Sequence, residues 1–500
     1  MTWQRSAGRR RLAPFEYRST HGCSPTKGLP TLDMTAVHEL SAAQLQRSYQ
    51  SRALSPVDVT RSLIDHVQRW EPHIAATWAF EPEVALAMAR SSESRWLKGQ
   101  ALGVLDGVPV TLKDNIATRG HAMPLGTAAT VLRAQPDDAP PAARLRAAGA
   151  VFLCKTTMPD YGMLSSGVSS FHGITRNPWD LNKSPGGSSS GAGAAAAAGY
   201  GPLHLGTDIG GSIRLPASWC GVVGYKPSQG RVPVHPPYIG RVAGPLTRTV
   251  HDAALMMATL SQPDARDTTA LPHQALPWAD EVGDPAQVLR GLKIGLWLDA
   301  GWGLVLDDDI RQAVLNAAAR LQAAGAVVEP LAPFASRDMA DGINCFWRLR
   351  SWLDISALTD EQRERVLPFI RGWVAEAADY SAAQAFHGYS QMGALRDATG
   401  AACQPFDAVI SPVAPVSAFA ATWAMPTNDP LRAMEHIGYT LPFNMGEQPA
   451  ISVPCAHTAA GMPIGLQITG RRHDDMGVLR VARAFEALRG PLRPWPDVPA

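Results

Sequence analysis

SPGGSSSGAGAAAAAGYG, residues 184–201, is the segment most informative about the fold, and it is soon followed by GTDIGGSIRLP at residues 206–216. A run of Gly and Ser is more often a flexible linker than a site. Here, however, it leads directly into a small-residue segment, Ala192–Ala198, with strong helix propensity and little side-chain bulk. Glycine permits strained backbone angles and alanine lets a helix lie close to its neighbours, which a linker does not need. The segment therefore predicts a tightly packed helix behind a serine-bearing turn.

The second turn carries Gly210, Gly211 and Ser212. Successive glycines can point backbone N–H groups into one concavity, as an oxyanion requires. Two glycine turns that both carry serine favour acyl transfer. Residues 187–191 also match G-x-S-x-G, the nucleophile elbow of the α/β-hydrolases, but that motif needs a buried strand immediately before it. NPWDLNKSP at 177–185 is not such a strand, so we set the elbow aside.

The segments on either side alternate between helical and strand-like patterns. Ser41 is a predicted N-cap, and Ser55-Pro56 is predicted to open a second helix. The change from helical periodicity to short β-branched runs predicts β-α-β units, and hence an α/β layered sheet. Further predicted helices are 81–97, 142–150, 309–325 and 476–490, and predicted strands are 107–114, 148–156, 292–299, 326–331, 406–416 and 450–457.

Composition excludes several classes of protein. The chain has 500 residues, 46% of them apolar, and 45 basic against 44 acidic residues give a net charge of +1, so no strong field attracts nucleic acid or an anionic membrane. No apolar run reaches the roughly 18 residues that span a bilayer. Six scattered cysteines and the absence of H-E-x-x-H predict no disulfide scaffold, no metal and no cofactor. We expect a cytoplasmic protein with a loosely attached, Arg-rich leader at residues 1–34.

Lys113 ends the apolar run GVPVTLKD, residues 107–114. Two interpretations stay open at this point. It is either an ordinary exposed lysine at a strand end, or a buried lysine whose charged form is disfavoured by desolvation. In the second case the pKa falls, and the neutral amine can act as a base, which serine alone cannot do.

At these residues the chain resembles the amidase signature enzymes, over about residues 35–495. The resemblance implies one α/β domain with a central mixed, twisted β-sheet flanked by helices on both faces. Within it, residues 335–400 are expected to form a helical insert that caps the substrate. The matching motifs are GVPVTLKDNI (107–116), GITRNPWDLNKSPGGSSSGAG (173–193), LGTDIGGSIRLPASWCGVVGYKPS (205–228), GPLTRTVHDAALM (244–256), and PFNMGEQPAISVP followed by GMPIGLQITG (442–470).

The resemblance also implies a catalytic triad. Ser212 is expected to be the acylated nucleophile and Lys113 the base. Ser188, preceded by a cis Gly187–Ser188 peptide bond, is expected to relay the proton between them. No metal and no cofactor enter this chemistry.

The remaining site residues are carried over in the same way. The backbone N–H groups of four residues are expected to form the oxyanion hole, and Gly162 is expected beside the substrate. Asp208 and Arg214 are expected to brace the turn as a charge-assisted pair, which is also compatible with a purely structural role. The four oxyanion-hole residues are Ile209, Gly210, Gly211 and Ser212.

The resemblance leaves three functions open. They are a stand-alone amidase for small or aryl amides, a hydrolase of carbamates, nylon-type oligomers or urea-type amides, and a glutaminase subunit of an amidotransferase complex. Leu215 stands where such subunits usually carry Gln, which disfavours the third. The expected partner is a small amide or carbamate, with no nucleic acid and no membrane; a homodimer stays open. Trp347, Trp352 and nearby Phe346 either wall the pocket or simply pack the insert.

Overall fold

The computed structural model describes residues 34–279 and 283–499. The predicted leader, residues 1–34, lies outside them except for Met34, which starts a short 3-10 helix, Met34–Glu39. The described residues form one large sheet and a two-stranded ribbon, β4 (Val168–Ser169) with β5 (Gly173–Ile174). From edge to edge the large sheet contains β1 (Thr77–Trp78), β3 (Val151–Thr156), β2 (Pro109–Lys113), β6 (Leu203–Asp208), β8 (Val242–Thr247), β7 (Val223–Lys226), β12 (Ala450–His457), β13 (Pro463–Gly470), β11 (Ala408–Pro412), β9 (Lys293–Leu296) and β10 (Val327–Pro330).

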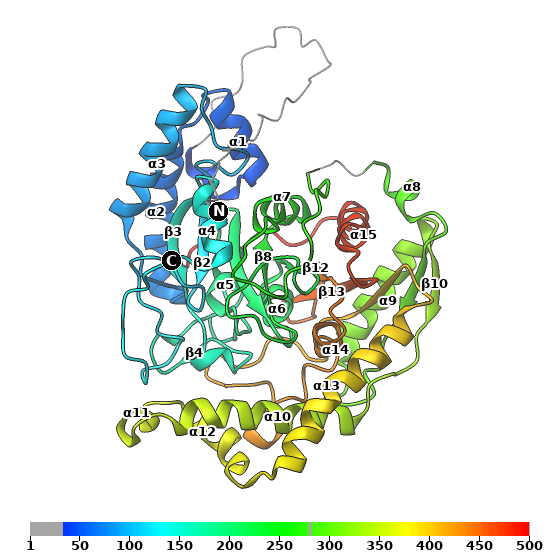
Figure 1. Ribbon diagram of the computed structural model, residues 1–500. Coiled ribbons are helices and arrows are strands. Elements are labelled where there is room, and N and C mark those ends of the chain that lie inside the picture. Colours follow the sequence, from blue (N-terminus) through cyan, green and yellow to red (C-terminus); the bar gives the residue numbers. More distant parts are fainter. Residues whose placement is uncertain (1–33, 280–282, 500) are drawn as a thin grey trace, which may run out of the picture.

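The sheet is mixed, as predicted. Strands β3, β2 and β6 run parallel to one another, as do β11, β9 and β10, whereas the strands between these two groups pair antiparallel. Every residue of β2, β6, β8 and β13 is buried, so both faces of the sheet's centre are covered. This confirms the α/β fold class, with helices packed around a central sheet (Figure 1).

The helices pack against the sheet and against each other. α5 and α6 contact the central strands, and so do α7, α9 and α15. The α-helices are α1 (Ala42–Gln50), α2 (Pro56–Ile74), α3 (Pro82–Leu97), α4 (Pro140–Ala147), α5 (Ser190–Ala198), α6 (Arg214–Cys220), α7 (Val250–Leu260), α8 (Pro285–Leu289), α9 (Asp308–Ala323), α10 (Arg337–Ser356), α11 (Asp360–Glu364), α12 (Pro368–Val374), α13 (Ala382–Cys403), α14 (Leu441–Met445) and α15 (Asp475–Leu488). The remaining 3-10 turns are Asp160–Gly162, Ala375–Asp379 and Pro430–Arg432.

Local capping explains where the first helices begin. Ser41 accepts a hydrogen bond from the Gln44 N–H, and the Gln44 side chain accepts one from the Ser41 N–H, so α1 starts with a capping box. The Ser55 hydroxyl accepts from Val57 and Asp58 at the start of α2. Both predicted helix starts are confirmed.

Helix α5 needs small residues because it runs through the middle of the molecule. All nine of its residues are buried. A Cβ on Gly191 would lie 2.3 Å from the Ala76 carbonyl oxygen, and one on Gly187, just before the helix, would lie 2.6 Å from the backbone of Ser166. The segment that could have been a linker is therefore among the most tightly packed parts of the chain.

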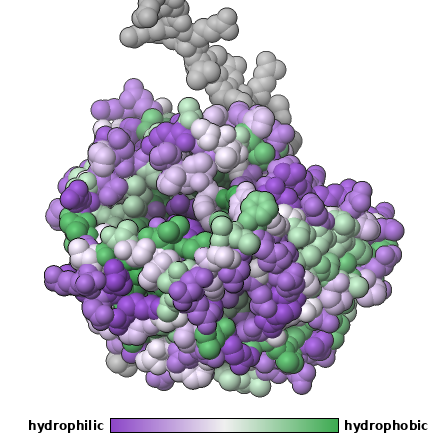
Figure 2. All heavy atoms as spheres, turned by 60° about the horizontal axis from the view of Figure 1, so that its bottom comes forward, coloured by the Kyte–Doolittle hydropathy of each residue, from purple (hydrophilic) through white to green (hydrophobic). Residues whose placement is uncertain are grey.

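The region at 335–400 is helical, as predicted. It contains α10 to α13, which lie at the lower side of the sheet in Figure 1. Viewed from that side, the surface is mostly hydrophilic, with hydrophobic residues in small groups around a hollow (Figure 2). Among the helices of residues 34–279 and 283–499, none is long and apolar enough to cross a bilayer.

Candidate active site

The candidate residues meet at one edge of the sheet. Strands β2 and β6 are parallel neighbours, so their carboxyl ends, Lys113 and Asp208, lie at the same edge. This is where open α/β sheets place their ligands. The turn after β6 leads to Ser212 and α6, and the turn before α5 supplies Ser188, whose neighbour Ser189 donates its N–H to the Ser212 carbonyl at 3.2 Å. Two turns that are distant in sequence are thus joined directly.

Lys113 is completely buried, which settles the choice left open by the sequence. Its Nζ contacts three hydroxyl groups: it donates to Ser188 Oγ at 2.8 Å, to Ser189 Oγ at 3.0 Å and to Thr207 Oγ1 at 3.1 Å. No carboxylate among the described residues forms an ion pair with it. A lysine held by hydroxyls alone has no fixed anion to keep it charged.

The surroundings of Lys113 favour its neutral form. The pKa of Lys113 is lowered to about 7, mainly by burial and also by the positive charge of Arg241, while Asp208 and Asp114 oppose the shift. An amine with this pKa is neutral in a large fraction of molecules near pH 7. It can therefore accept a proton where an ordinary lysine cannot.

Ser188 faces the cavity, whereas Ser189 is turned inward. Ser188 lines a cavity together with Ser212. Ser189 instead donates to the Thr207 carbonyl at 3.2 Å and accepts from the Thr207 N–H at 3.3 Å, both in the protein interior. The peptide bond between Gly187 and Ser188 is cis, and a Cβ on Gly162 would lie 3.3 Å from Ser188 Oγ. Gly162 thus leaves open the space in front of Ser188.

The turn after β6 keeps most of its N–H groups available. The N–H groups of Ile209, Gly210 and Ser212 have no acceptor among the described residues. The Gly211 N–H, predicted to be a fourth free donor, instead donates to Asp208 Oδ1 at 2.8 Å. This N–H therefore helps to shape the turn, and its part in an oxyanion hole stays a prediction.

Asp208 and Arg214 form a fully buried pair under this turn. Arg214 donates through Nε and Nη2 to the two carboxylate oxygens of Asp208, at 3.1 and 3.0 Å, and neither side chain is exposed. Asn444 donates to the same carboxylate at 2.8 Å and accepts from Arg214 at 2.6 Å. Although burial opposes it, the charge and hydrogen bonds of Arg214 hold the pKa of Asp208 well below its usual range. The turn is therefore fixed by charge-assisted bonds.

Replacing Arg214 by methionine should lower the free energy of unfolding by about 3–5 kcal/mol, because Asp208 would be left buried and unpaired. Urea unfolding followed by circular dichroism measures the loss. The matched control is Arg365→Met, which removes an ion pair between Arg365 and Glu361 whose side chains are 53% and 79% exposed. Such a pair contributes about 0–1 kcal/mol. Equal losses in the two variants would contradict a structural role for the buried pair.

Two cavities lie beside Ser212. The first, which we call the polar cavity, has a volume of about 350 Å³ and contains Ser188 and Thr207. The second, the aromatic cavity, has a volume of about 120 Å³ and contains Gly210 and Trp347. Ser212 lines both. Tyr161, Gly162, Ile209, Tyr238 and Arg350 also line both cavities.

Helices α10 and α12 of the insert contribute to the wall of the aromatic cavity. Trp347 on α10 lies close to the turn: a Cβ on Gly210 would be 3.3 Å from its indole ring. Trp373 on α12 lines the same cavity. Trp352 does not line it and packs within the insert, and Phe346 packs against Tyr389 with ring centroids 5.5 Å apart. Of the aromatic residues singled out in the sequence, only Trp347 reaches the site.

Several residues at the site escaped the sequence analysis. Thr207 contacts the Lys113 amine and lies within a quoted motif, directly before Asp208, so its position was the available signal. Tyr238, Arg241 and His436 line the two cavities from loops with no motif. Both ring nitrogens of His436 are buried without a partner among the described residues. Burial lowers the pKa of His436 to about 3, so this ring is neutral.

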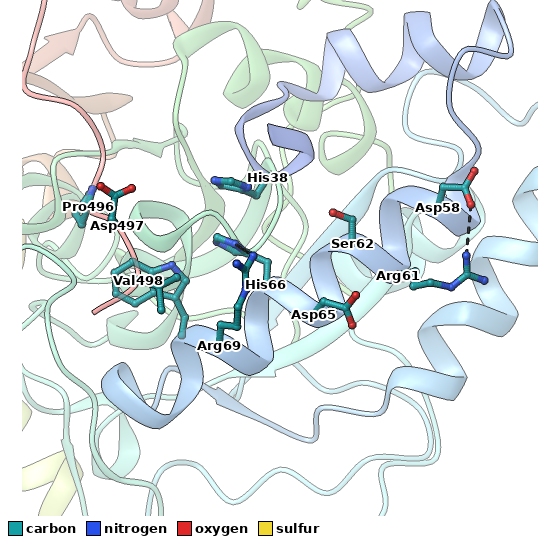
Figure 3. A pocket seen from close by; sticks show the side chains of 11 residues that line it. His38, Asp58, Arg61, Ser62, Asp65, His66, Arg69, Pro496, Asp497 and Val498 are labelled. Carbon is teal, nitrogen blue, oxygen red and sulfur yellow. Dashed lines mark hydrogen bonds and ion pairs between the residues drawn. The ribbon is translucent and has the colours of Figure 1, made fainter. Parts of the chain in front are cut away.

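A third cavity lies apart from these residues. It has a volume of about 610 Å³ and lies between α2 and the C-terminal segment (Figure 3). Its wall contains His38 stacked on His66, with ring centroids 4.1 Å apart, and an exposed ion pair between Arg61 and Asp58 at 3.4 Å. None of the candidate catalytic residues lines it. The candidate active site is therefore separate from this cavity.

Comparison with known proteins shows the family to which the chain belongs. Residues 58–479 match the family model described as Amidase, so the chain belongs to the amidase signature family. Among curated proteins it is similar to a glutamyl-tRNA(Gln) amidotransferase subunit from Myxococcus xanthus (strain DK1622), with 34% identity over 90% of this chain and 97% of that protein. The corresponding protein from Alkaliphilus metalliredigens (strain QYMF) is 30% identical over 92% of this chain and 99% of that protein.

Similar solved structures include amidases. A bacterial aryl acylamidase of the amidase signature family superposes with a TM-score of 0.81 at 29% identity, covering 90% of this chain and 96% of that chain. A peptide amidase from Stenotrophomonas maltophilia gives 0.80 at 26% identity, with 93% of this chain and 100% of that chain covered. The 6-aminohexanoate cyclic dimer hydrolase gives 0.77 at 28% identity, covering 91% and 98%. The match to the family model shows the amidase signature family, and the similar structures show its fold.

Proposed function

We propose that this protein is a stand-alone amidase that hydrolyses the C–N bond of small or aryl amides, with Ser212 as nucleophile. The observation that carries the proposal is the completely buried Lys113 amine, 2.8 Å from Ser188 Oγ. A serine hydroxyl is a weak nucleophile until a base removes its proton. Lys113 is the group at this site whose pKa, at about 7, suits that task near neutral pH.

The first half of the reaction forms an acyl-enzyme. Neutral Lys113 has one lone pair, so the Ser188 hydroxyl donates to it while Ser189 and Thr207 accept its two N–H groups. As Ser212 Oγ attacks the carbonyl carbon, its proton passes to Ser188 and the Ser188 proton passes to Lys113. The carbonyl oxygen becomes an anion, which the free N–H groups after Asp208 stabilise by about 2.7–4 kcal/mol per donor.

Loss of the amine completes the acyl-enzyme, and hydrolysis then releases the acid. The tetrahedral intermediate collapses when its C–N bond breaks, and the departing nitrogen takes the Ser188 proton, which Lys113 replaces. A water molecule then gives a proton through the same relay and attacks the acyl carbon. Breaking the C–O bond to Ser212 returns that proton to Oγ and frees the carboxylic acid. Lys113 is neutral again at the end of the cycle.

The shape of the site indicates which cavity takes which part of the substrate. Ser188 lines the polar cavity and not the aromatic one. Because Ser188 protonates the leaving nitrogen, the amine must lie in the polar cavity. The acyl group then lies in the aromatic cavity, against Trp347.

Trp347→Ala should lower kcat/KM for a phenylacetyl anilide about 10–100-fold relative to the acetyl anilide, since the larger acyl group loses its apolar contact. The ratio of kcat/KM for the two substrates measures the effect. Trp352→Ala is the control, because Trp352 packs in the same insert without lining the cavity. If both variants change the ratio alike, the aromatic cavity does not hold the acyl group.

A panel of para-nitroanilides, aliphatic amides and carbamates tests the reaction class. We expect turnover of the aryl amides with an initial burst of amine, and an acyl group on the peptide that contains Ser212 in mass spectrometry. Carbamates differ in the acyl portion beside the carbonyl and are the main alternative substrates. A folded protein that turns over none of these compounds would contradict the proposal.

The second candidate is a glutaminase subunit of an amidotransferase complex. It is favoured by the curated relatives, which are subunits of glutamyl-tRNA(Gln) amidotransferases. Leu215, buried beside the turn, is the sequence feature against it. Ammonia release from glutamine, together with gel filtration to detect a tightly bound partner, separates the two functions.

A further inference from the structure

Among the described charged side chains that line the polar cavity, one positive charge has no carboxylate partner. Arg350 forms an ion pair with Asp354 at 3.3 Å, and Asp208 is paired with Arg214 at 3.0 Å. Arg241 lines the same cavity and has no carboxylate partner among the described residues. Its guanidinium makes one long hydrogen bond, from Nη1 to the Pro236 carbonyl at 3.5 Å. The cavity therefore presents one uncompensated positive charge.

A second unpaired group lies on the same loop. The Tyr238 Oη is buried and has no hydrogen-bond partner among the described residues. The Arg241 N–H donates to the Tyr238 carbonyl at 3.0 Å, so a tight turn fixes the two residues relative to each other. Arg350 lies over the Tyr238 ring, 5.3 Å from its centroid, and limits where that ring can move. The loop thus presents a guanidinium that makes one long hydrogen bond and has no carboxylate partner, and a hydroxyl that has no hydrogen-bond partner among the described residues.

We propose that the polar cavity recognises a carboxylate on the leaving amine, bound by Arg241 and Tyr238, so that the preferred substrates are N-acyl derivatives of amino acids or aminobenzoates. This inference rests on the proposed function, which places the leaving amine in the polar cavity. A carboxylate matches the planar guanidinium in two parallel hydrogen bonds and accepts a further one from a hydroxyl. The unpaired charge and the unpaired hydroxyl would then be satisfied by one ligand.

A pair of matched substrates tests the inference. The N-phenylacetyl derivative of 4-aminobenzoate carries a negative charge, and that of its methyl ester does not, while the acyl group is the same. In the wild-type protein we measure kcat/KM for both and form the ratio of acid to ester. In Arg241→Gln this ratio should fall about 10–100-fold, because a charge-assisted contact is lost for one substrate only. Tyr238→Phe should lower it less, and Arg241→Lys should retain part of it.

Comparing the two substrates as a ratio cancels a second effect of Arg241, which is its effect on the turnover of both. Its charge also contributes to the lowered pKa of Lys113, so any change at this position alters the turnover of both substrates alike. The control is Arg133→Gln, which removes the same charge from an exposed position and should leave the ratio unchanged. Inhibition gives an independent readout, with cleavage of the amide bond in the methyl-ester substrate as the measured reaction. In the wild type, free 4-aminobenzoate should inhibit this reaction more strongly than 4-aminobenzamide does. In Arg241→Gln, the two compounds should inhibit it equally.

The outcomes separate the inference from the function on which it rests. If the ester is turned over and the ratio is the same in wild type and Arg241→Gln, the carboxylate site is wrong and the amidase assignment stands. If the wild type turns over neither substrate and forms no acyl-serine, both are wrong. A ratio that falls equally in Arg133→Gln would reduce the effect to overall charge and would also overturn the inference.

Discussion

Replacing Ser212 by alanine should lower kcat for an aryl amide by about 10⁵-fold or more, because no acyl-enzyme can form and the other members of the triad act only through this hydroxyl. Substrate affinity should change little, since the cavity walls stay in place. Stopped-flow release of para-nitroaniline measures kcat, and the initial burst of amine should disappear. The absence of any acyl group on the peptide that contains residue 212 distinguishes a missing nucleophile from a weakened base, which still acylates slowly.

Neighbouring serines provide the controls for this result. Ser190→Ala removes only a hydrogen bond to the Thr157 carbonyl at 3.3 Å and should keep most of the activity. Ser188→Ala should be severely impaired, and Ser189→Ala less so, because only the first of these two lines the polar cavity. Turnover that persists in Ser212→Ala at the wild-type rate would move the nucleophile to another residue.

Lys113→Met should lower kcat/KM by about 10³–10⁴-fold, since general base catalysis is lost while the buried apolar stem is kept. In the wild type, activity should rise with pH through about 7, where burial places the pKa of Lys113, and then level off. The sign follows from the mechanism, because the neutral amine is the active form and it is populated above the pKa. In the variant this inflection should be absent.

Lys155 offers a matched control for the loss of a buried lysine. It lies on the neighbouring strand β3, donates to the Ile116 carbonyl and to Thr118, and burial lowers its pKa to about 8. It lines neither cavity beside Ser212. Lys155→Met should therefore leave the pH dependence of kcat/KM unchanged. If the inflection near pH 7 survived in Lys113→Met and vanished in Lys155→Met, the proposed base would be wrong.

The sequence predicted those parts of the fold in which local chemistry and periodicity agree. Ser41 and Ser55 cap helices where expected, and the strand predicted at 450–457 is found as β12. The strand predicted at 292–299 is shorter, Lys293–Leu296: the Trp297 N–H still donates to the Ile410 carbonyl of β11, but its side chain packs into a separate cluster and the strand ends there. A run of apolar residues indicates which positions are buried, and buried positions continue beyond the end of the strand.

The central strands were harder to predict because they are buried on both sides. β6 and β8 read LHLGTD and VAGPLT, with no alternation of apolar and polar residues and with glycine inside each. In β6, the glycine is required because a Cβ on Gly206 would lie 2.7 Å from the Leu246 side chain and 2.8 Å from Ser189 Oγ. Features set by such close approaches depend on the tertiary structure, so periodicity does not reveal them.

The sequence predicted those site residues that lie within the quoted motifs. The quoted motifs contained Lys113, Ser188 and Ser212, and the structure brings the first two into direct contact and places the third on the same cavity. Arg241 and Tyr238 lie in a loop whose conformation no motif specifies. Their closeness to Ser188 arises from how this loop folds over the sheet edge, and their lack of partners is visible only when all the neighbouring charges are placed.

The tight packing around α5 limits how this enzyme can acquire new substrates. Gly187 and Gly191 have no room for even one more carbon atom, so random mutagenesis of the 184–201 segment should yield mainly insoluble protein. Helices α10 and α12 of the insert and the loop around Tyr238 line the aromatic cavity with larger side chains. A library directed at those two segments would change selectivity while sparing the groups that perform the chemistry, which makes this scaffold suited to engineering.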